Sequence, residues 1–262
     1  MVTKEKIQTI VVLGSGNVAT HLSIAFYQAG FKILQVYSRN LGNARELANK
    51  IGANFTSDLA KINDNSDLYL FAISDSAIQS VLENKNWTGK ILVHTAGSIS
   101  IEIFKPYSEN FGVIYPLQTF SKKRDIDISN VPFFIEASSQ GIADTLESLV
   151  KKISKIIYSI SFKDREILHL AAVFANNFSN HMFAVAAEIL KKHNLPFDYL
   201  KPLIEETSLK AIELGPTAAQ TGPAIRANPD VMQKHITLLE NETELQNLYK
   251  FISDNIIKYH KN

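Results

Sequence analysis

The chain has 262 residues, of which 45% are hydrophobic, and its 27 Lys and Arg nearly balance its 26 Asp and Glu, so the formal net charge is +1. This balance excludes the strongly basic surface that non-specific nucleic-acid binding needs, and the absence of cysteine excludes disulfides, thiolate nucleophiles and cysteine-ligated metals. No apolar run approaches the ~20 residues of a membrane span, and no signal-peptide pattern is present. We expect a cytoplasmic protein without membrane or nucleic-acid partners.

Residues 9–160 alternate short apolar runs with longer amphipathic stretches. The apolar runs, rich in Ile, Val, Leu and Phe as strands covered on both faces are, lie at 9–13, 32–37, 67–73, 90–94, 111–115, 132–136 and 156–159. The helical stretches between them lie at 17–29, 41–50, 76–83, 100–107 and 140–152. This alternation predicts an α/β domain over 1–160 with a Rossmann-type, doubly wound, mainly parallel sheet.

Beyond residue 160 the pattern is helical only. Residues 163–192 predict one long helix whose middle is apolar almost all round, and further helices are predicted at 198–214, 231–239 and 242–259. A helix that is apolar on most faces must be buried, which in a domain of this size often requires a second subunit. We expect an all-α C-terminal domain over 161–262 that contributes to substrate binding and forms a homodimer.

A glycine-rich turn at 14–19 (GSGNVA) follows the first predicted strand and opens the first helix. Gly14 permits a tight turn, Gly16 lets the backbone approach a pyrophosphate, and Ala19 is small enough for close helix–strand packing. The amides at the start of the helix then face the phosphates. We predict a dinucleotide phosphate loop, with a purely structural turn as the alternative. The predicted phosphate-loop residues are Gly14, Ser15, Gly16, Asn17 and Val18.

The end of the second predicted strand indicates the type of dinucleotide. Residues 37–40 (YSRN) contain no acidic residue, whereas NAD-binding sites usually carry Asp or Glu there. Arg39 offers its guanidinium to a 2′-phosphate, and Ser38 can donate a hydrogen bond. These residues predict NADP(H) binding, with a solvated loop arginine as the alternative. Ser74 follows the strand at 67–73 at the same carboxyl edge, so we expect it to contact the cofactor too.

Polar residues that follow the next strands are candidates for substrate binding. The loop 94–98 (HTAGS) leaves the strand at 90–94, and we expect Ser98 to hydrogen-bond the substrate beside the nicotinamide. A loop that leads to a capped helix is the alternative. Gln118 and Thr119 end the following strand on the same rim and are further pocket candidates.

The long helix carries polar residues inside its apolar middle. His169, Asn176 and Asn180 lie at spacings of seven and four residues, close to one helix face. Polar groups in such a place are costly unless paired, so they line a pocket, pair across a helix interface, or both. His169 is the best candidate for a general acid, and Asn176 for holding substrate. No His-Glu-x-x-His arrangement occurs, so we predict no metal site.

Seven motifs together resemble one family. They are LGSGNVA at 13–19, YSR at 37–39, AISD at 72–75, HTAGS at 94–98, PLQTF at 116–120, FANN at 174–177 and TGPAIR at 221–226. The chain resembles the Rossmann-like NADP oxidoreductases whose C-terminal helical domain has no known function (DUF2520). More distantly, its layout is similar to pyrroline-5-carboxylate reductase, the β-hydroxyacid dehydrogenases and ketopantoate reductase. The resemblance implies hydride transfer in a cleft between an N-terminal NADP-binding domain and a dimer-forming helical domain.

Two positions depart from the patterns of these relatives. The β-hydroxyacid dehydrogenases carry a catalytic Lys where this chain has Val173, and the His that the family pattern places before PLQTF is Tyr115 here. The resemblance therefore does not identify a proton donor. It also implies that Arg226 faces the cleft, where this side chain either binds an anionic group or forms an ion pair.

The motifs and the resemblance together predict a function. We expect an NADP(H)-dependent oxidoreductase that moves hydride to or from a small carbonyl or imine substrate, with Ser98, His169 and Asn176 holding or protonating that substrate. The alternative is a non-catalytic NADP-binding regulatory or sensor protein, which the absence of a Lys at residue 173 favours.

Overall fold

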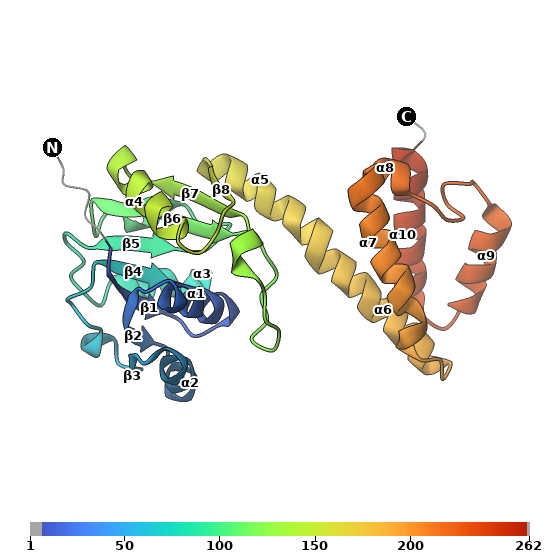
Figure 1. Cartoon of the computed structure of the whole chain (residues 1–262). Helices are drawn as coiled ribbons and strands as arrows, with labels where there is room; N and C mark the ends of the chain where they lie inside the picture. Colours follow the sequence, from blue (N-terminus) through green and yellow to red (C-terminus); the bar gives the residue numbers. More distant parts are fainter. Residues whose placement is uncertain (1–6, 261–262) are drawn as a thin grey trace. The chain divides into compact units, whose positions relative to one another are not determined.

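The first part of the chain forms an eight-stranded sheet with helices on both faces (Figure 1). In this computed structural model, which describes residues 7–260, the strand order is β3-β2-β1-β4-β5-β6-β7-β8. All neighbouring strands are parallel except β6 and β7, which are antiparallel. The predicted fold class, a Rossmann-type and mainly parallel sheet followed by helices, is confirmed.

The strands match the predicted apolar runs closely. They are β1 (Thr9–Leu13), β2 (Lys32–Tyr37), β3 (Asn54–Thr56), β4 (Leu68–Phe71), β5 (Ile91–His94), β6 (Asn110–Pro116), β7 (Phe133–Ala137) and β8 (Ile157–Ser159). The sequence pattern does not predict β3, because this edge strand has only three residues and no apolar run. It pairs through its backbone with β2, and that pairing alone defines it as a strand.

The four α-helices of the sheet-containing part also lie where the pattern predicts them. The helices of this part are α1 (Asn17–Gln28), α2 (Leu41–Ile51), α3 (Asp75–Leu82), α4 (Gln140–Val150) and the short 3₁₀ helices η1 (Leu59–Lys61), η2 (Ile101–Phe104) and η3 (Ile128–Asn130). The pattern does not predict the short helices η1 and η3. The stretch predicted as a helix at 100–107 is the short η2. Pro106 lacks an N–H and so cannot donate the next helical hydrogen bond, which accounts for the early end.

The rest of the described chain is helical. It contains α5 (Phe162–Ala172), the π-helix η4 (Val173–Phe178), α6 (Ser179–Lys192), η5 (Phe197–Leu200), α7 (Lys201–Leu214), α8 (Pro216–Ala219), α9 (Pro229–Leu238) and α10 (Thr243–Tyr259). α5, η4 and α6 follow one another without a break over the predicted long helix. Within residues 7–260, no helix combines the length and the apolar composition that crossing a membrane requires.

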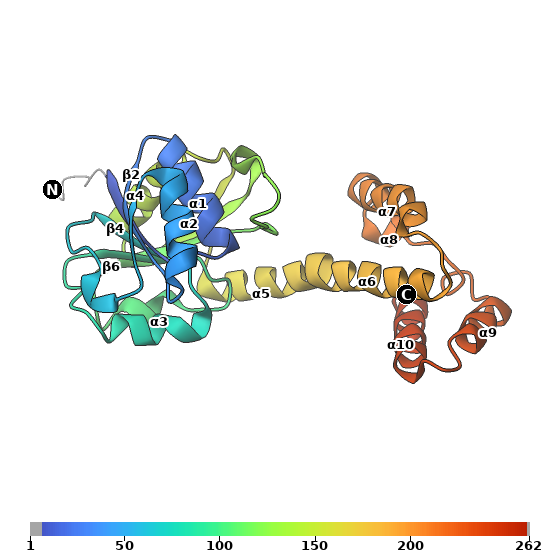
Figure 2. The same ribbon diagram turned by 90° about the horizontal axis from the view of Figure 1, so that it is seen from below.

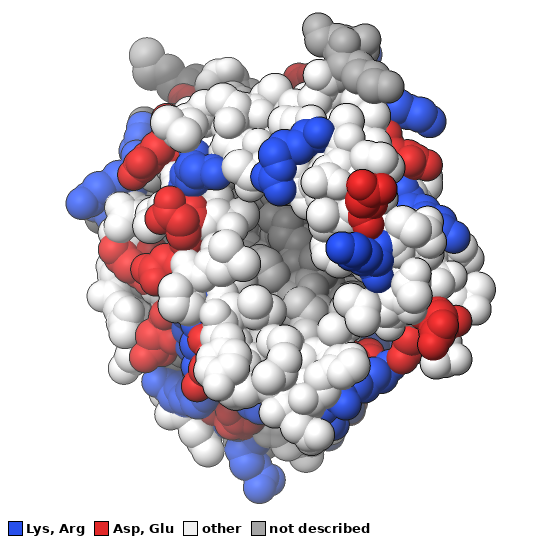
Figure 3. Space-filling view, turned by 90° about the vertical axis from the view of Figure 1, so that its right-hand side faces the viewer, with Lys and Arg blue, Asp and Glu red and all other residues white. Residues whose placement is uncertain are grey.

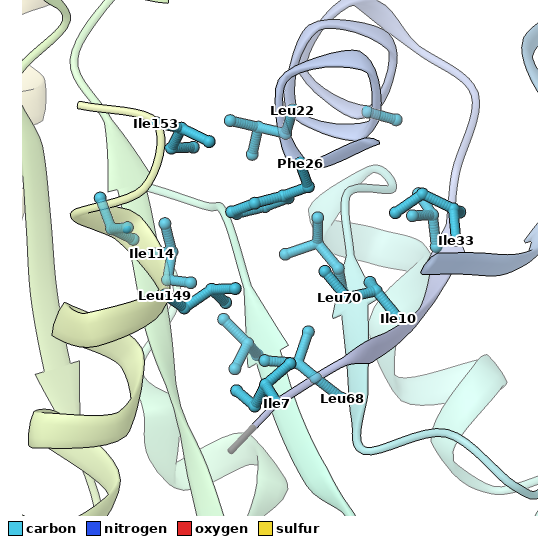
Figure 4. Close-up of a cluster of buried hydrophobic side chains, with 14 of the residues drawn as sticks. Ile7, Ile10, Leu22, Phe26, Ile33, Leu68, Leu70, Ile114, Leu149 and Ile153 are labelled. Carbon is cyan, nitrogen blue, oxygen red and sulfur yellow. The ribbon is translucent and has the colours of Figure 1, made fainter. Parts of the chain in front are cut away.

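Helices lie on both faces of the sheet, as Figure 2 shows, and an apolar layer fills the space on each face. On one face, Leu22 and Phe26 of α1 and Leu149 of α4 pack against Ile10 and Leu70 of the sheet, as Figure 4 shows. On the other face, α3, η2 and the buried Trp87 cover the same strands. The strands are therefore buried on both sides, which explains why their sequences are continuous apolar runs rather than alternating ones.

The chain forms two compact units, Met1–Asn180 and His181–Asn262. The first has the two cores just described. In the described part of the second, Ala224 is the one apolar residue that is buried, whereas Ile212, Leu238 and Phe251 are 80%, 75% and 72% exposed. The second unit therefore has almost no apolar core within a single chain.

Candidate active site

The glycine-rich turn lies at the point where the strand order reverses, between β1 and β4. Gly14 has a φ of +126°, and a Cβ at this position would lie 2.1 Å from the carbonyl oxygen of Ala72, so no other residue fits. The Gly14 N–H donates to the Tyr37 carbonyl at 2.8 Å. The turn is thus held tightly against the ends of β2 and β4, where ligands of open α/β sheets bind.

The start of α1 beyond this turn is open. Gly16 is exposed at the N-cap, no side chain caps the helix, and a Cβ on Gly16 would meet no atom within 4 Å. Asn17 is exposed, with its side-chain oxygen accepting a hydrogen bond from the Lys122 N–H at 3.2 Å, and Val18 is half-buried. An uncapped helix N-terminus with free space in front of it suits a phosphate group.

The other predicted cofactor residues border the same edge. The Ser15 hydroxyl donates to the Ser38 hydroxyl at 2.8 Å, which joins the turn to the end of β2. Arg39 is exposed and has no ion-pair partner among residues 7–260. Ser74 is exposed at the N-cap of α3, and its hydroxyl makes no capping hydrogen bond. Hydroxyls, an unpaired guanidinium and a helix N-terminus form a donor set that fits a phosphorylated dinucleotide.

A second feature of the first unit is a hollow of about 420 Å³ between the end of β6 and the face formed by α5 and η4. Its polar lining residues are Tyr115, Gln118, Thr119, His169, Asn176 and Asn177, and its apolar ones are Leu117, Leu168, Ala171, Ala172, Val173 and Ala175. The hollow therefore brings together His169, Asn176 and the rim of β6, as the sequence predicts. Among the described residues, its lining contains no Lys, Arg, Asp or Glu.

His169 and Tyr115 form a hydrogen-bonded pair in this hollow. The Tyr115 hydroxyl lies 3.0 Å from His169 Nδ1, and the two rings meet edge to face. Burial raises the pKa of the Tyr115 hydroxyl, and the positive charge of Arg165 partly opposes this effect. The loop after β5 packs on the same imidazole, because a Cβ on Gly97 would lie 2.7 Å from His169 Cγ and Nδ1.

Arg165 fixes the helix that carries His169. Its side chain is fully buried, one helical turn before His169, and it donates to the carbonyls of Ala96 at 2.7 Å and Ile99 at 2.8 Å. It also forms an ion pair with Glu136 of β7 at 3.0 Å. The hydrogen bonds of this one guanidinium thus tie α5 to the loop after β5 and to the sheet.

His94, in contrast, is not suited to proton transfer. It is fully buried at the end of β5, where desolvation and, to a lesser extent, the Arg165 charge lower its pKa to about 3. Its Nδ1 accepts a hydrogen bond from the Ala96 N–H at 3.2 Å. His94 is therefore neutral at physiological pH and serves to hold the loop.

The remaining predicted substrate residues have different surroundings. Asn176 lies within the π-helix η4 and is exposed, on the side that lines the hollow. Ser98 does not line the hollow, and its hydroxyl donates to the Asp75 carboxylate at the start of α3 at 2.7 Å. Arg226 is exposed within the second unit.

The sequence did not single out two residues of the site. The sequence marks Tyr115 only as a departure from the family pattern, and no sequence motif includes Arg165. A charged residue one turn before a candidate His was an available signal, but helical residues of this type are usually solvated. Only the contacts of Arg165 with residues 29 to 69 positions away reveal its role.

Two family models match different parts of the chain. Residues 9–97 match the model described as NADP oxidoreductase, coenzyme F420-dependent, and residues 131–256 match a domain of unknown function, DUF2520. No curated protein matches the chain. The first match lies within the predicted nucleotide-binding part, and the second covers the end of that part and the helices that follow it.

Comparison with solved structures shows to which family the chain belongs. A crystal structure from Bacteroides fragilis, of a protein assigned to the NADP oxidoreductases, is 45% identical with a TM-score of 0.91, over 98% of this chain and 100% of that one. The chain belongs to this NADP oxidoreductase family. The resemblance predicted from the motifs is thereby confirmed, and the chain is an oxidoreductase of the NADP class.

More distant structures show the fold alone. A protein from Thermotoga maritima is 22% identical with a TM-score of 0.80, over 97% of this chain and 100% of that one. A reductive aminase from Aspergillus terreus, solved with NADPH and ethyl levulinate, is 12% identical with a TM-score of 0.74, over 97% and 95%. The arrangement of a Rossmann-type sheet followed by helices is common to all of them.

Proposed function

We propose that the chain is an NADP(H)-dependent oxidoreductase that reduces, or in reverse forms, the C=O or C=N bond of a small molecule. The observation that carries this proposal is the hollow that contains the Tyr115–His169 pair. It lies in the same unit as the glycine-rich turn, and it offers a titratable imidazole, amides and hydroxyls but no fixed charge among the described residues. This lining suits a neutral carbonyl or imine.

The cofactor residues have distinct roles in this proposal. The turn from Gly14 to Gly16 and the first amides of α1 hold the pyrophosphate, with Asn17 and Val18 at the helix start. Arg39 and the Ser15–Ser38 hydroxyl pair hold the 2′-phosphate, because a guanidinium and hydroxyls donate hydrogen bonds to phosphate oxygens. Bound NADPH supplies a hydride to the substrate carbon.

The chain's own residues handle the substrate and its proton. Asn176 and the residues at the end of β6 hold the substrate by hydrogen bonds, and His169 delivers a proton to the oxygen or nitrogen that hydride addition leaves basic. Ser98 supports the loop through Asp75. We assign cofactor binding to residues 1–160 and substrate holding to 161–262 together with the rim of the sheet.

Calorimetry and cofactor oxidation test this proposal. We expect NADPH to bind more tightly than NADH, and Arg39→Asp to weaken NADPH at least 10-fold while changing NADH little, because the carboxylate repels the 2′-phosphate. We also expect NADPH to be oxidised in the presence of at least one member of a panel of small aldehydes, ketones and cyclic imines. Lys61→Asp, an exposed change on η1, is the matched charge control.

Two results would contradict parts of the proposal. Equal affinities for NADPH and NADH, or equal effects of Arg39→Asp on both, would remove Arg39 from cofactor selection. Tight NADPH binding without oxidation across the whole panel would favour the non-catalytic sensor.

We also propose that two copies of the chain pair through the helical unit. Burying an apolar side chain stabilises a protein by about 1.5–3 kcal/mol, so a unit with one buried apolar residue needs further partners. Leu170, Phe174 and Phe178 add an exposed apolar stripe along α5 and η4. Figure 3 shows a face that carries a wide area of uncharged side chains.

A further inference from the structure

We propose that Tyr115 and His169 form a proton relay, in which the Tyr115 hydroxyl donates to Nδ1 of a neutral His169 and the opposite Nε2–H protonates the substrate. This inference rests on the proposed reductase function. The inference adds three points to that function: the tautomer of His169, the ring nitrogen that faces the substrate, and the group that supplies the proton.

The hydrogen-bond partners determine the direction of the pair. Tyr115 is buried, and among residues 7–260 its hydroxyl has one hydrogen-bond partner, His169 Nδ1 at 3.0 Å. Burial raises the pKa of Tyr115, so the phenol is protonated near neutral pH and donates. Neutral imidazole carries one proton, so Nδ1 accepts and the proton is on Nε2.

The ring is held so that Nε2 is available. Gly97 packs against Cγ and Nδ1 of the imidazole, and Tyr115 binds Nδ1, so both contacts are on one edge of the ring. No hydrogen bond to Nε2 occurs among residues 7–260, and His169 lines the hollow. Nε2 is therefore the ring nitrogen that can hydrogen-bond to a substrate.

Three other charged or titratable groups surround the pair, and they favour this arrangement. Arg165 on α5 is a fixed cation whose charge acts to lower the pKa of Tyr115, which stabilises a transient tyrosinate. Glu136 on β7 is bound to Arg165, and His94 on β5 is neutral.

The reduction step balances as follows. The hydride from NADPH forms a C–H bond at the carbonyl or imine carbon, and the electron pair of the double bond moves to the oxygen or nitrogen. The Nε2–H bond breaks as that atom is protonated, and Nδ1 takes the Tyr115 proton. An alkoxide or an amide anion is a far stronger base than a tyrosinate, so the transfer is favourable. Water in the hollow then protonates Nε2, leaving hydroxide, and the Nδ1 proton returns to the Tyr115 oxygen, which restores both groups.

Nuclear magnetic resonance of ¹⁵N-histidine-labelled protein tests the pair without substrate. The His169→Gln variant identifies the His169 signals by their loss. We expect wild-type protein at neutral pH to show a fixed Nε2–H tautomer, and Tyr115→Phe to show shifts averaged between both tautomers. Tyr69→Phe is the matched control, because Tyr69 is also buried and its hydroxyl donates to the Asn63 carbonyl at 2.8 Å, away from the hollow. A tautomer that is mixed in wild type, or unchanged in Tyr115→Phe, would overturn the relay.

The pH profile of turnover tests the proton source. We expect wild-type kcat for reduction to be nearly constant from about pH 6 to 9, because burial holds the pKa of Tyr115 above the ordinary tyrosine value. In Tyr115→Phe the relay lacks its proton source, so kcat falls about 10- to 100-fold at pH 8. Tyr69→Phe keeps the wild-type profile.

The two proposals fail in different ways. Turnover by Tyr115→Phe with a wild-type rate and profile would overturn the relay alone. An absence of turnover by wild type on every substrate, with a fixed Nε2–H tautomer, would overturn the reductase function while the hydrogen-bonded pair stands.

Discussion

The buried side chain of Arg165 links α5 to the loop after β5 and to β7. Its guanidinium is fully buried, it donates to two carbonyls of the loop after β5, and it forms an ion pair with Glu136, whose side chain is 20% exposed. A buried ion pair contributes little net stability when compared with an apolar replacement, but removal of one partner leaves a costly unpaired charge. Arg165 also positions His169, one turn further along α5.

We predict that Arg165→Met lowers the free energy of unfolding by about 3 kcal/mol or more, because Glu136 and the loop carbonyls lose their donor. Urea denaturation measures this change. Lys151→Met, in an exposed pair with Glu147, is the control and should have little effect. Similar losses in both variants would show that the burial of Arg165 does not matter.

At the level of elements, α5 contacts the loop after β5 through Arg165 and His169, and η4 lines the hollow. The π-helix places Asn176 and Asn177 on the hollow, and the Ser179 hydroxyl donates to the Phe174 carbonyl at 3.3 Å, five residues back. π-turns within α-helices are frequent at functional sites. The periodicity of the sequence predicts a helix here but not the wider turn.

We predict that Gly97→Ala displaces His169, because the new methyl group would lie 2.7 Å from the imidazole. The expected result is a fall in kcat of at least 10-fold with unchanged NADPH affinity, measured by steady-state kinetics and calorimetry. Gly141→Ala is the control, since its nearest neighbour is 4.0 Å away at the Ser139 hydroxyl. Equal kcat values for the two variants would contradict the close packing of Gly97 on His169.

At the level of the whole molecule, the two units differ in how they are stabilised. The sheet unit buries large side chains such as Trp87, Phe26 and Phe104 completely. The helical unit exposes most of its apolar residues, and soluble proteins rarely leave so much apolar surface without a partner. A second copy of the chain supplies the missing core in our proposal.

We predict a homodimer with a mass near twice 29.3 kDa in sedimentation equilibrium at micromolar concentration. Phe251→Glu should shift it toward monomer, because Phe251 is 72% exposed in the single chain and a charge there opposes burial. Leu41→Glu, at an exposed position on α2, is the control. A wild-type mass of one chain would contradict the dimer.

The sequence by itself determined most of the strands and helices and the glycine-rich turn, because both depend on local pattern. Apolar runs and their spacing predict β1 and β2 to the residue, and glycine is required where Gly14 approaches Ala72. The short edge strand β3 and the π-helix η4 were not predictable in this way, because neither leaves a distinctive local pattern.

Only the tertiary structure decided which residues meet. Tyr115 and His169 lie 54 positions apart, and their hydrogen bond depends on the packing of α5 against the carboxyl edge of the sheet. The burial of Arg165 depends on the same contact, since an arginine on a helix is solvated unless another element covers it and offers acceptors. Non-local contacts of this kind bring a tyrosine hydroxyl to an imidazole and bury a guanidinium, and no periodicity along the chain encodes them.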